Sequence, residues 1–182
     1  LVPFAFALSG LWRTAFNGWF QPALPWAFTG VAIFGLGILM GGAWAYEALS
    51  FGGFWAWDPV ENASLVPWIA LVAGAHLMMV FRSKGSSLLA AFFLILMSFL
   101  LVLYSTFLTR SGILGDTSVH AFTDLGMSGQ LLVYLLFYTV VALALLAIRW
   151  KDFPKNTSEE QLWSREFWMF IGSLILLFSA FG

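Results

Sequence analysis

Two tryptophans, an aspartate and a glutamate stand close together in the stretch FGGFWAWDPVENAS, residues 51–64. Large aromatic rings stack on flat apolar surfaces, and neighbouring carboxylates either orient polar groups or cap a helix. Trp55 and Trp57 are separated by one alanine, and Asp58 and Glu61 follow within one helical turn. These residue types at this spacing predict a binding site for a large, flat ligand that carries a few polar groups.

Further aromatic residues surround this stretch, namely Trp44, Phe51, Phe54 and Trp68. Membrane interfaces are enriched in tryptophan in any polytopic protein, which accounts for one or two of these rings. It accounts poorly for four tryptophans within residues 44–68, where Gly52 and Gly53 also permit a close backbone approach. A porphyrin fits the whole set, and cationic or sterol-like ligands fit the aromatic count as well.

Asp58 stands directly before Pro59, an order of residues that is typical of a helix start. Aspartate is a good N-cap, and proline is favoured at the first helical position. Capping alone accounts for Asp58. It does not account for Glu61 one turn later, with Trp55 and Trp57 just ahead, so a second role is expected for this group.

The two histidines, His76 and His120, are candidate metal ligands. His76 lies in the apolar stretch VAGAHLMMVF, where an ionisable residue indicates a function, although neutral imidazole also serves as a hydrogen-bond partner between helices. His120 lies in TRSGILGDTSVHAFTD. Most histidines in such loops have no special role, but the apolar neighbours here suit a ligand shielded from water. Imidazole is a standard axial ligand of haem iron.

Composition indicates the elements that must position these residues. The chain has 182 residues, of which 61% are hydrophobic and 9% charged, and its mean hydropathy is +0.90. Soluble domains carry about 25% charged residues, so the sequence predicts an integral membrane protein surrounded by lipid. It has no cysteine, and therefore any thiol chemistry must use the thiols of a partner.

The hydropathy pattern predicts an all-α fold, a polytopic transmembrane helix bundle that forms a single domain over residues 1–182. About 20 apolar residues cross a bilayer as a helix. Full spans are expected at 24–46, 62–81, 88–109 and 130–148, with partial spans at 1–8 and 167–182. Because the chain starts at Leu1 and stops within an apolar run, we expect it to be part of a longer polypeptide.

The cationic residues predict the orientation of the bundle. Seven of the eight lysines and arginines lie in residues 9–23, 82–87 and 149–166, and only Arg110 lies in the other connecting segments. Cytoplasmic loops carry the excess of these residues. We therefore expect the tryptophan-rich segment 47–61 and the histidine-bearing loop 110–129 to face outward, on the periplasmic side of a bacterial inner membrane or its organelle equivalent.

Three motifs in order carry a family resemblance: GGAWAYEALSFGGFWAWDPVENASLVPW, AHLMM and FLTRSGILGDTSVHAF. Together, over about residues 25 to 125, they resemble the CcmF family of haem-handling cytochrome c assembly proteins, including its nitrite-reductase-maturation relatives. Two-component synthases and CcmC-type haem exporters share an aromatic segment, but WDPVENAS and the histidine loop look more like CcmF. The family's tryptophan-rich WWD motif usually opens with tryptophan where this chain has Phe51, and has further aromatic residues at Ala56.

The resemblance implies a haem lyase component that presents haem for covalent attachment to apocytochrome c. By resemblance, His120 ligates the haem being delivered and His76 ligates a second, resident haem b, each with a partner histidine outside this chain. Trp55 and Trp57, with Phe51 and Trp44 as neighbouring aromatics, stack on or edge the macrocycle, while Asp58 and Glu61 cap and orient the segment. Arg110 is a candidate partner for a haem propionate, and a lipid phosphate or Asp116 serves it equally well.

The partners implied are apocytochrome c, a haem chaperone donor, and a CcmH-type or thioredoxin-like protein that handles apocytochrome. The net charge of −1 gives no reason to expect nucleic-acid binding.

The alternative function is a membrane haem or small-molecule exporter. Such transporters have polar, discontinuous spans near the bilayer midplane, whereas the spans here are apolar apart from His76. A subunit merely anchored by its tryptophans is a third reading, which the outward carboxylates disfavour.

Overall fold

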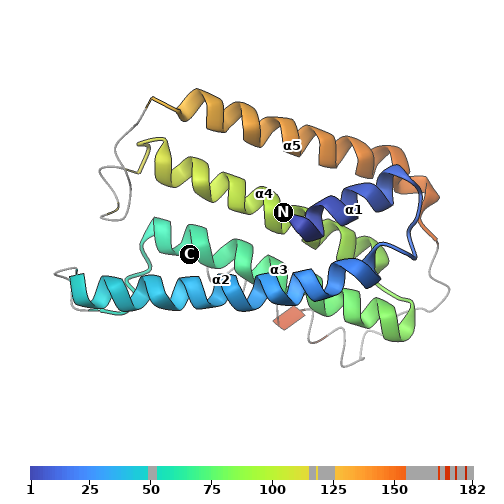
Figure 1. Cartoon of the computed structure of the whole chain (residues 1–182), viewed down its shortest axis with the longest axis horizontal. Coiled ribbons are helices and arrows are strands. Elements are labelled where there is room, and N and C mark those ends of the chain that lie inside the picture. Colours follow the sequence, from blue (N-terminus) through green and yellow to red (C-terminus); the bar gives the residue numbers. More distant parts are fainter. Residues whose placement is uncertain are drawn as a thin grey trace.

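A computed structural model describes residues 1–48, 53–114, 118 and 126–154, and single positions from 168 to 179. Within these residues the chain forms five α-helices and a short 3₁₀ helix, and no strand. The helices lie side by side along the long axis of the molecule (Figure 1). Their bounds are α1 Val2–Trp12, α2 Phe20–Ala48, α3 Pro59–Lys84, α4 Leu88–Arg110 and α5 Ser128–Arg149, followed by η1 Trp150–Asp152.

Four of the helices, α2 to α5, are long and apolar enough to cross a membrane. The shortest has 22 residues, which at 1.5 Å per residue matches a hydrocarbon core about 30 Å thick. Each full span expected from the sequence lies inside one of these helices. The helices extend past the apolar runs because the flanking polar residues continue or cap them. The chain is an integral membrane protein.

Charged side chains separate between the two ends of the bundle. The helices alternate in direction, so α1, α3 and α5 end where α2 and α4 begin (Figure 1). We call this end the basic end, since the described cations Arg13, Arg82, Lys84, Arg149 and Lys151 lie there. At the opposite end, which we call the tryptophan end, α2 finishes and α3 starts, with Glu47, Asp58, Glu61 and the cation Arg110.

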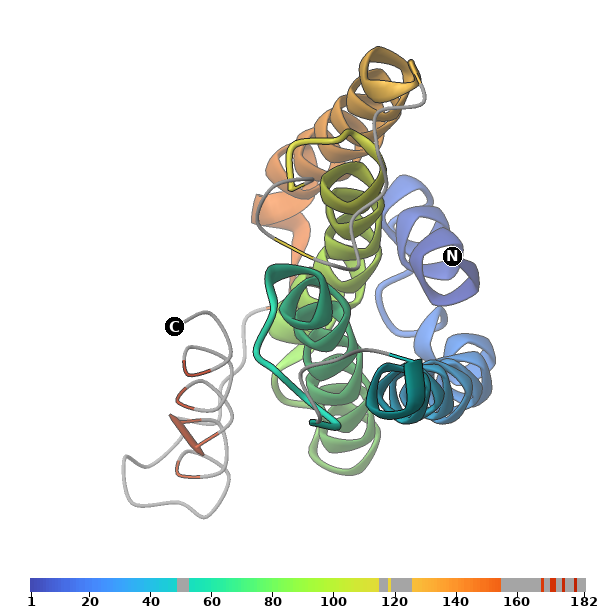
Figure 2. The ribbon, with the colours of Figure 1, turned by 90° about the vertical axis from the view of Figure 1, so that its left-hand side faces the viewer.

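Helix α4 lies between α3 and α5, with α1 and α2 on one flank (Figure 2). The contact between α3 and α4 is close because α3 has a glycine at the crossing: a Cβ added at Gly74 would lie 2.9 Å from Ile95 Cδ1 and 3.3 Å from its backbone nitrogen. The Ser105 hydroxyl also donates a hydrogen bond to the Ala63 carbonyl across this interface. The largest buried side chains include Phe4, Leu11, Met78, Phe92 and Leu96.

Helices α2 and α3 are held together by a second set of close contacts. Added Cβ atoms at Gly30 and Gly35 would lie 3.2 Å from Leu71 and 3.0 Å from Trp68 Nε1. That indole donates a hydrogen bond to the Val31 carbonyl at 2.9 Å. The glycines of α2 therefore set how deeply Trp68 enters the seam between the two helices, and this seam carries both cavities described below.

Candidate functional site

The start of α3 is built by two carboxylates. The Asp58 carboxylate accepts a hydrogen bond from the Val60 amide at 2.9 Å, and Glu61 Oε2 accepts from the Asp58 amide at 3.3 Å, which completes a capping box. Glu61 Oε2 also accepts from the Ala56 amide at 2.8 Å. The helix start expected at Asp58 and Pro59 is thus confirmed. Glu61 has the second role of holding the preceding tryptophan segment against the helix.

Trp57 adopts an unusual backbone conformation directly before this cap. Its φ is +56°, in the left-handed region that bulky side chains rarely enter. The Asn62 amide group donates to the Trp57 carbonyl at 3.3 Å and helps to hold the turn. The turn sets the rings of Trp55 and Trp57 edge to face, with centroids 6.1 Å apart and planes at 82°. Strain of this kind is typical of functional sites.

These aromatic residues form one wall of a groove of about 470 Å³, which we call the aromatic groove. Its volume lies in the range of small-molecule sites. The groove runs between α2, the segment 53–58 and α3. It is lined by Gly35, Ile38, Leu39, Phe54, Trp55, Trp57, Leu65 and Trp68. Such a surface suits the face of a flat apolar ligand.

Three buried polar atoms close to the groove have no hydrogen-bond partner among the described residues. They are Trp55 Nε1, Glu61 Oε1 and Asn62 Oδ1. Only 8% of Glu61 is exposed. A buried group left unpaired costs about 1–3 kcal/mol, so native structures rarely tolerate three together. One donor and two acceptors are therefore available to a ligand or to chain outside the described residues, as an amphipathic ligand with polar substituents requires.

Among the described residues, a hydrogen bond joins Ser118, which lies between α4 and α5, to the cap of α3. The Ser118 hydroxyl donates to Asp58 Oδ2 at 2.6 Å, and only 8% of Ser118 is exposed. A hydroxyl bound to a carboxylate at this distance is a strong, charge-assisted interaction. Sequence reasoning missed Ser118, because nothing local marks one serine as the partner of an aspartate 60 positions away.

His76 lies on α3 with its ring exposed on the surface of the described bundle. Its Nδ1 is 2.8 Å from the Val72 carbonyl oxygen. Because a carbonyl only accepts, Nδ1 carries the proton in this contact, and the neutral ring keeps a lone pair on Nε2. A backbone hydrogen bond of this kind commonly orients a metal-ligating histidine. Among the described residues, the hydrogen-bond partner of the ring belongs to its own helix.

His76 and the aromatic groove share one side of α3. Leu65, Val72, His76 and Met79 are spaced by seven, four and three residues, the spacing of a single helical face. Leu65 lines the groove toward the tryptophan end. Met79 lines another cavity toward the basic end. His76 therefore stands between two cavities on the same face.

The other site residues predicted from the sequence do not line the aromatic groove or lie outside the described residues. Trp44 is 55% exposed near the end of α2 and does not line the aromatic groove. Arg110 ends α4 at the tryptophan end and is exposed. Phe51 and His120 lie outside the described residues. Phe54 and Trp68 line the groove as well, although the sequence marked them only as part of the aromatic surroundings.

Comparisons with known proteins agree with this arrangement. Residues 14–114 match the family described as cytochrome C assembly protein. The chain is 38% identical over 181 residues to the cytochrome c-type biogenesis protein CcmF of Pseudomonas aeruginosa, covering 98% of this chain and 27% of that protein. It is 36% identical over 182 residues to the probable cytochrome c-type biogenesis protein NrfE of Escherichia coli, covering 99% of this chain and 32% of the relative.

A solved structure, that of the cytochrome c haem lyase CcmF, matches with a TM-score of 0.73 and 29% identity. The match covers 99% of this chain and 26% of that protein. The chain thus spans about a quarter to a third of the length of these relatives. The family match covers more than half of the chain and includes α2, α3, α4 and the aromatic groove. The chain therefore belongs to the cytochrome C assembly protein family, with CcmF among its relatives.

Proposed function

We propose that the chain is part of a haem lyase component that holds haem at the tryptophan end for covalent attachment to apocytochrome c. The observation that carries this proposal is the Ser118 to Asp58 hydrogen bond, which joins the histidine-bearing loop to the segment that builds the aromatic groove. His120 follows Ser118 by two positions, a separation that a peptide spans with about 7 Å at most. The relatives named for cytochrome c biogenesis and as a haem lyase support this function.

In this proposal the delivered haem is the substrate. Trp55 and Trp57 contact its macrocycle, the Trp55 indole N–H meets a polar substituent, and His120 ligates the iron from one side. Arg110, the cation of this end among the described residues, pairs with a propionate. Two cysteine thiols of the apocytochrome then add across the two vinyl groups: each sulfur bonds to one vinyl carbon and each thiol hydrogen goes to the other. No electrons are exchanged, and the thiols come from the partner.

A resident haem b at His76 is the second part of the proposal. The free Nε2 lone pair, the backbone bond that orients the ring and the ring's exposure on the described bundle all suit an axial ligand. His76 would hold this haem together with a residue outside this chain, since the other histidine, His120, is assigned to the delivered haem. When bound, this haem supplies electron transfer that keeps the delivered iron ferrous.

The proposed setting is a bacterial inner membrane or its organelle equivalent, with the tryptophan end on the periplasmic side. The concentration of cations at the basic end supports this orientation. The proposed partners are apocytochrome c, a haem chaperone donor and a CcmH-type or thioredoxin-like protein that presents the apocytochrome thiols. Export is not favoured, because the relatives are named for cytochrome c biogenesis and as a haem lyase.

Ser118→Ala in the full-length parent protein should lower the yield of holocytochrome c several-fold to tenfold. The change removes one charge-assisted hydrogen bond to Asp58 and so frees the loop that carries His120. Covalent haem staining of cytochrome c from cells that depend on the protein measures the yield. Ser64→Ala is the matched control, since that hydroxyl donates only to the Glu61 carbonyl of its own helix. Ser118→Thr keeps a hydroxyl and should restore activity. A normal yield from Ser118→Ala contradicts the proposed coupling.

Gly42→Ala should weaken porphyrin binding at the tryptophan end. A Cβ at this position would lie 2.5 Å from Phe54 Cε1, so the ring must leave its place in the wall of the groove. Gly41→Ala is the control, because a Cβ there meets nothing within 4 Å. Quenching of tryptophan emission by added protoporphyrin in detergent gives the porphyrin affinity of each of the two variants. Equal affinities for the two variants would show that Phe54 does not shape the porphyrin site.

A further inference from the structure

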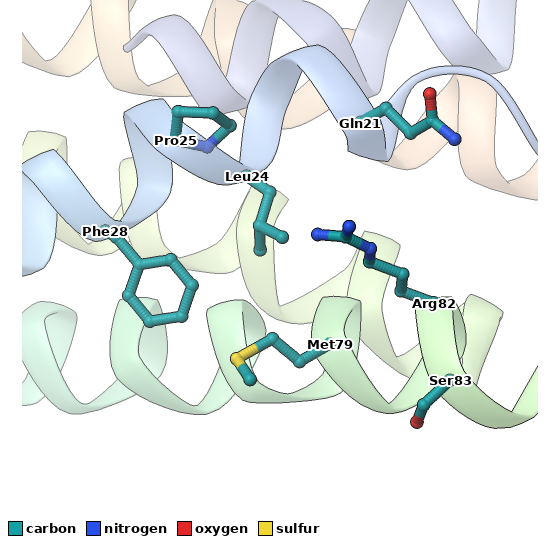
Figure 3. Close-up of a pocket in the computed structure, with 7 residues that line it drawn as sticks. All are labelled: Gln21, Leu24, Pro25, Phe28, Met79, Arg82 and Ser83. Carbon is teal, nitrogen blue, oxygen red and sulfur yellow. The ribbon is translucent and has the colours of Figure 1, made fainter.

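A second cavity, of about 800 Å³, lies at the basic end between the start of α2 and the end of α3 (Figure 3). Most of its wall is apolar, with Leu24, Pro25 and Phe28 from α2 and Met79 from α3. Its polar lining consists of Gln21, Arg82 and Ser83, all near the basic end. The cavity is therefore amphipathic along the helix axis, with an apolar middle and a polar, cationic end.

Arg82 provides the charge of this cavity. Its side chain extends from α3 into the space between the two helices, toward Leu24 (Figure 3). Across the described parts of the chain, Arg82 makes no hydrogen bond or salt bridge. The Ser83 hydroxyl donates to the Val80 carbonyl at 3.1 Å, which leaves Arg82 and Gln21 as the donors available to a ligand. Two such donors suit carboxylate groups.

The cavity begins one helical turn beyond His76, at Met79, and Arg82 lines it further round the helix, on the side that faces α2. Met79 is one turn beyond His76 on the same face, and Arg82 follows three residues later, so Arg82 lies about 9 Å along the axis from His76. This rise is similar to the distance from the centre of a porphyrin to the carboxylates at its edge. A porphyrin ligated at His76 and lying flat on this face would cover Met79, with Phe28 at its side.

We infer that Arg82 and Gln21 hold the propionates of a haem whose iron is ligated by His76. The inference rests on the proposed resident haem and adds its polar subsite and its direction: propionates toward the basic end. Arginines at helix ends also extend to lipid headgroups. The carboxylate assignment is favoured here because Arg82 shares the lining of one cavity with a second donor, Gln21, and this largely apolar cavity is wide enough for a ring.

A double-mutant cycle tests this inference with the full-length parent protein, stripped of haem and reconstituted in detergent. Haem and haem dimethyl ester, whose propionates are uncharged, are each titrated into the wild type, Arg82→Gln and Lys84→Gln. We expect Arg82→Gln to weaken haem binding about tenfold or more, and esterification to weaken wild-type binding similarly. In Arg82→Gln, esterification should have little further effect, because the partner of the carboxylates is already gone.

Lys84→Gln removes a cation two residues away that does not line the cavity, and it should bind both ligands like the wild type. Arg82→Lys retains the charge and should give an intermediate affinity for haem, and Arg82→Ala replaces Arg82→Gln in the cycle if that variant elutes as an aggregate. If Arg82→Gln and Lys84→Gln have the same small effect on both ligands, Arg82 serves the lipid and the inference is overturned.

His76→Ala separates failure of this inference from failure of the proposed function. If His76→Ala still binds haem like the wild type, the resident haem is not at His76 and both fail. If His76→Ala loses the haem while Arg82 and the carboxylates show no coupling, only the propionate assignment fails. Loss of haem in His76→Ala together with coupling at Arg82 supports both.

Discussion

His76→Ala should remove the resident haem from the purified full-length parent protein. The imidazole has a proton on Nδ1 bound to the Val72 carbonyl at 2.8 Å, so Nε2 faces outward with its lone pair free. If His76 holds this haem, the substitution would remove one protein bond to the iron and leave a much weaker complex. Reduced-minus-oxidised spectra and pyridine haemochrome assays of the detergent-purified protein measure the loss, which we expect to exceed tenfold in haem content.

Two further variants distinguish ligation from packing. Val72→Ala trims the neighbouring side chain but keeps the backbone carbonyl that orients His76, and should retain the haem. His76→Gly opens a space where free imidazole can bind iron, so added imidazole should restore the low-spin spectrum. This histidine does not ligate haem if His76→Ala keeps the wild-type haem content. The same conclusion follows if added imidazole does not restore the low-spin spectrum of His76→Gly.

His120→Ala should abolish holocytochrome c formation while the resident haem remains. Ser118, two positions before His120, bonds to the cap of α3 beside the aromatic groove, and no other histidine lies in residues 47–61 or 110–129. Covalent haem staining of secreted cytochrome c measures the product, and spectra of the same purified protein report the resident haem. The expected result is product below detection with an unchanged b-type spectrum.

Thr117→Ala is the control in the same loop, since it alters a neighbouring side chain without removing an imidazole. It should give normal product. His120→Cys or His120→Met tests whether another iron ligand supports partial activity. If His120→Ala matures cytochrome c normally, the delivered haem is ligated elsewhere. If it loses the resident haem as well, the two sites are not separate and the two-haem proposal is wrong.

Much of this protein follows from local sequence. The four long apolar runs determine membrane-spanning helices, because in a bilayer the backbone must satisfy its own hydrogen bonds within each span. The start of α3 is equally local: Asp58, Pro59 and Glu61 lie within four residues and form the capping box by themselves. The concentration of aromatic residues around this start predicted a site at this end of the chain, and several of these residues line a groove there.

Only the tertiary structure decided how these residues meet. The Ser118 to Asp58 bond joins positions 60 residues apart, and Trp68 reaches Val31 only because glycines let α2 and α3 approach closely. From the sequence, Arg82 was only one of several cations near one end of the bundle. The packing of α2 against α3 makes it part of the lining of a cavity. Periodicity gives the face of a helix, but which faces oppose one another depends on side-chain packing between distant segments, which no local pattern specifies.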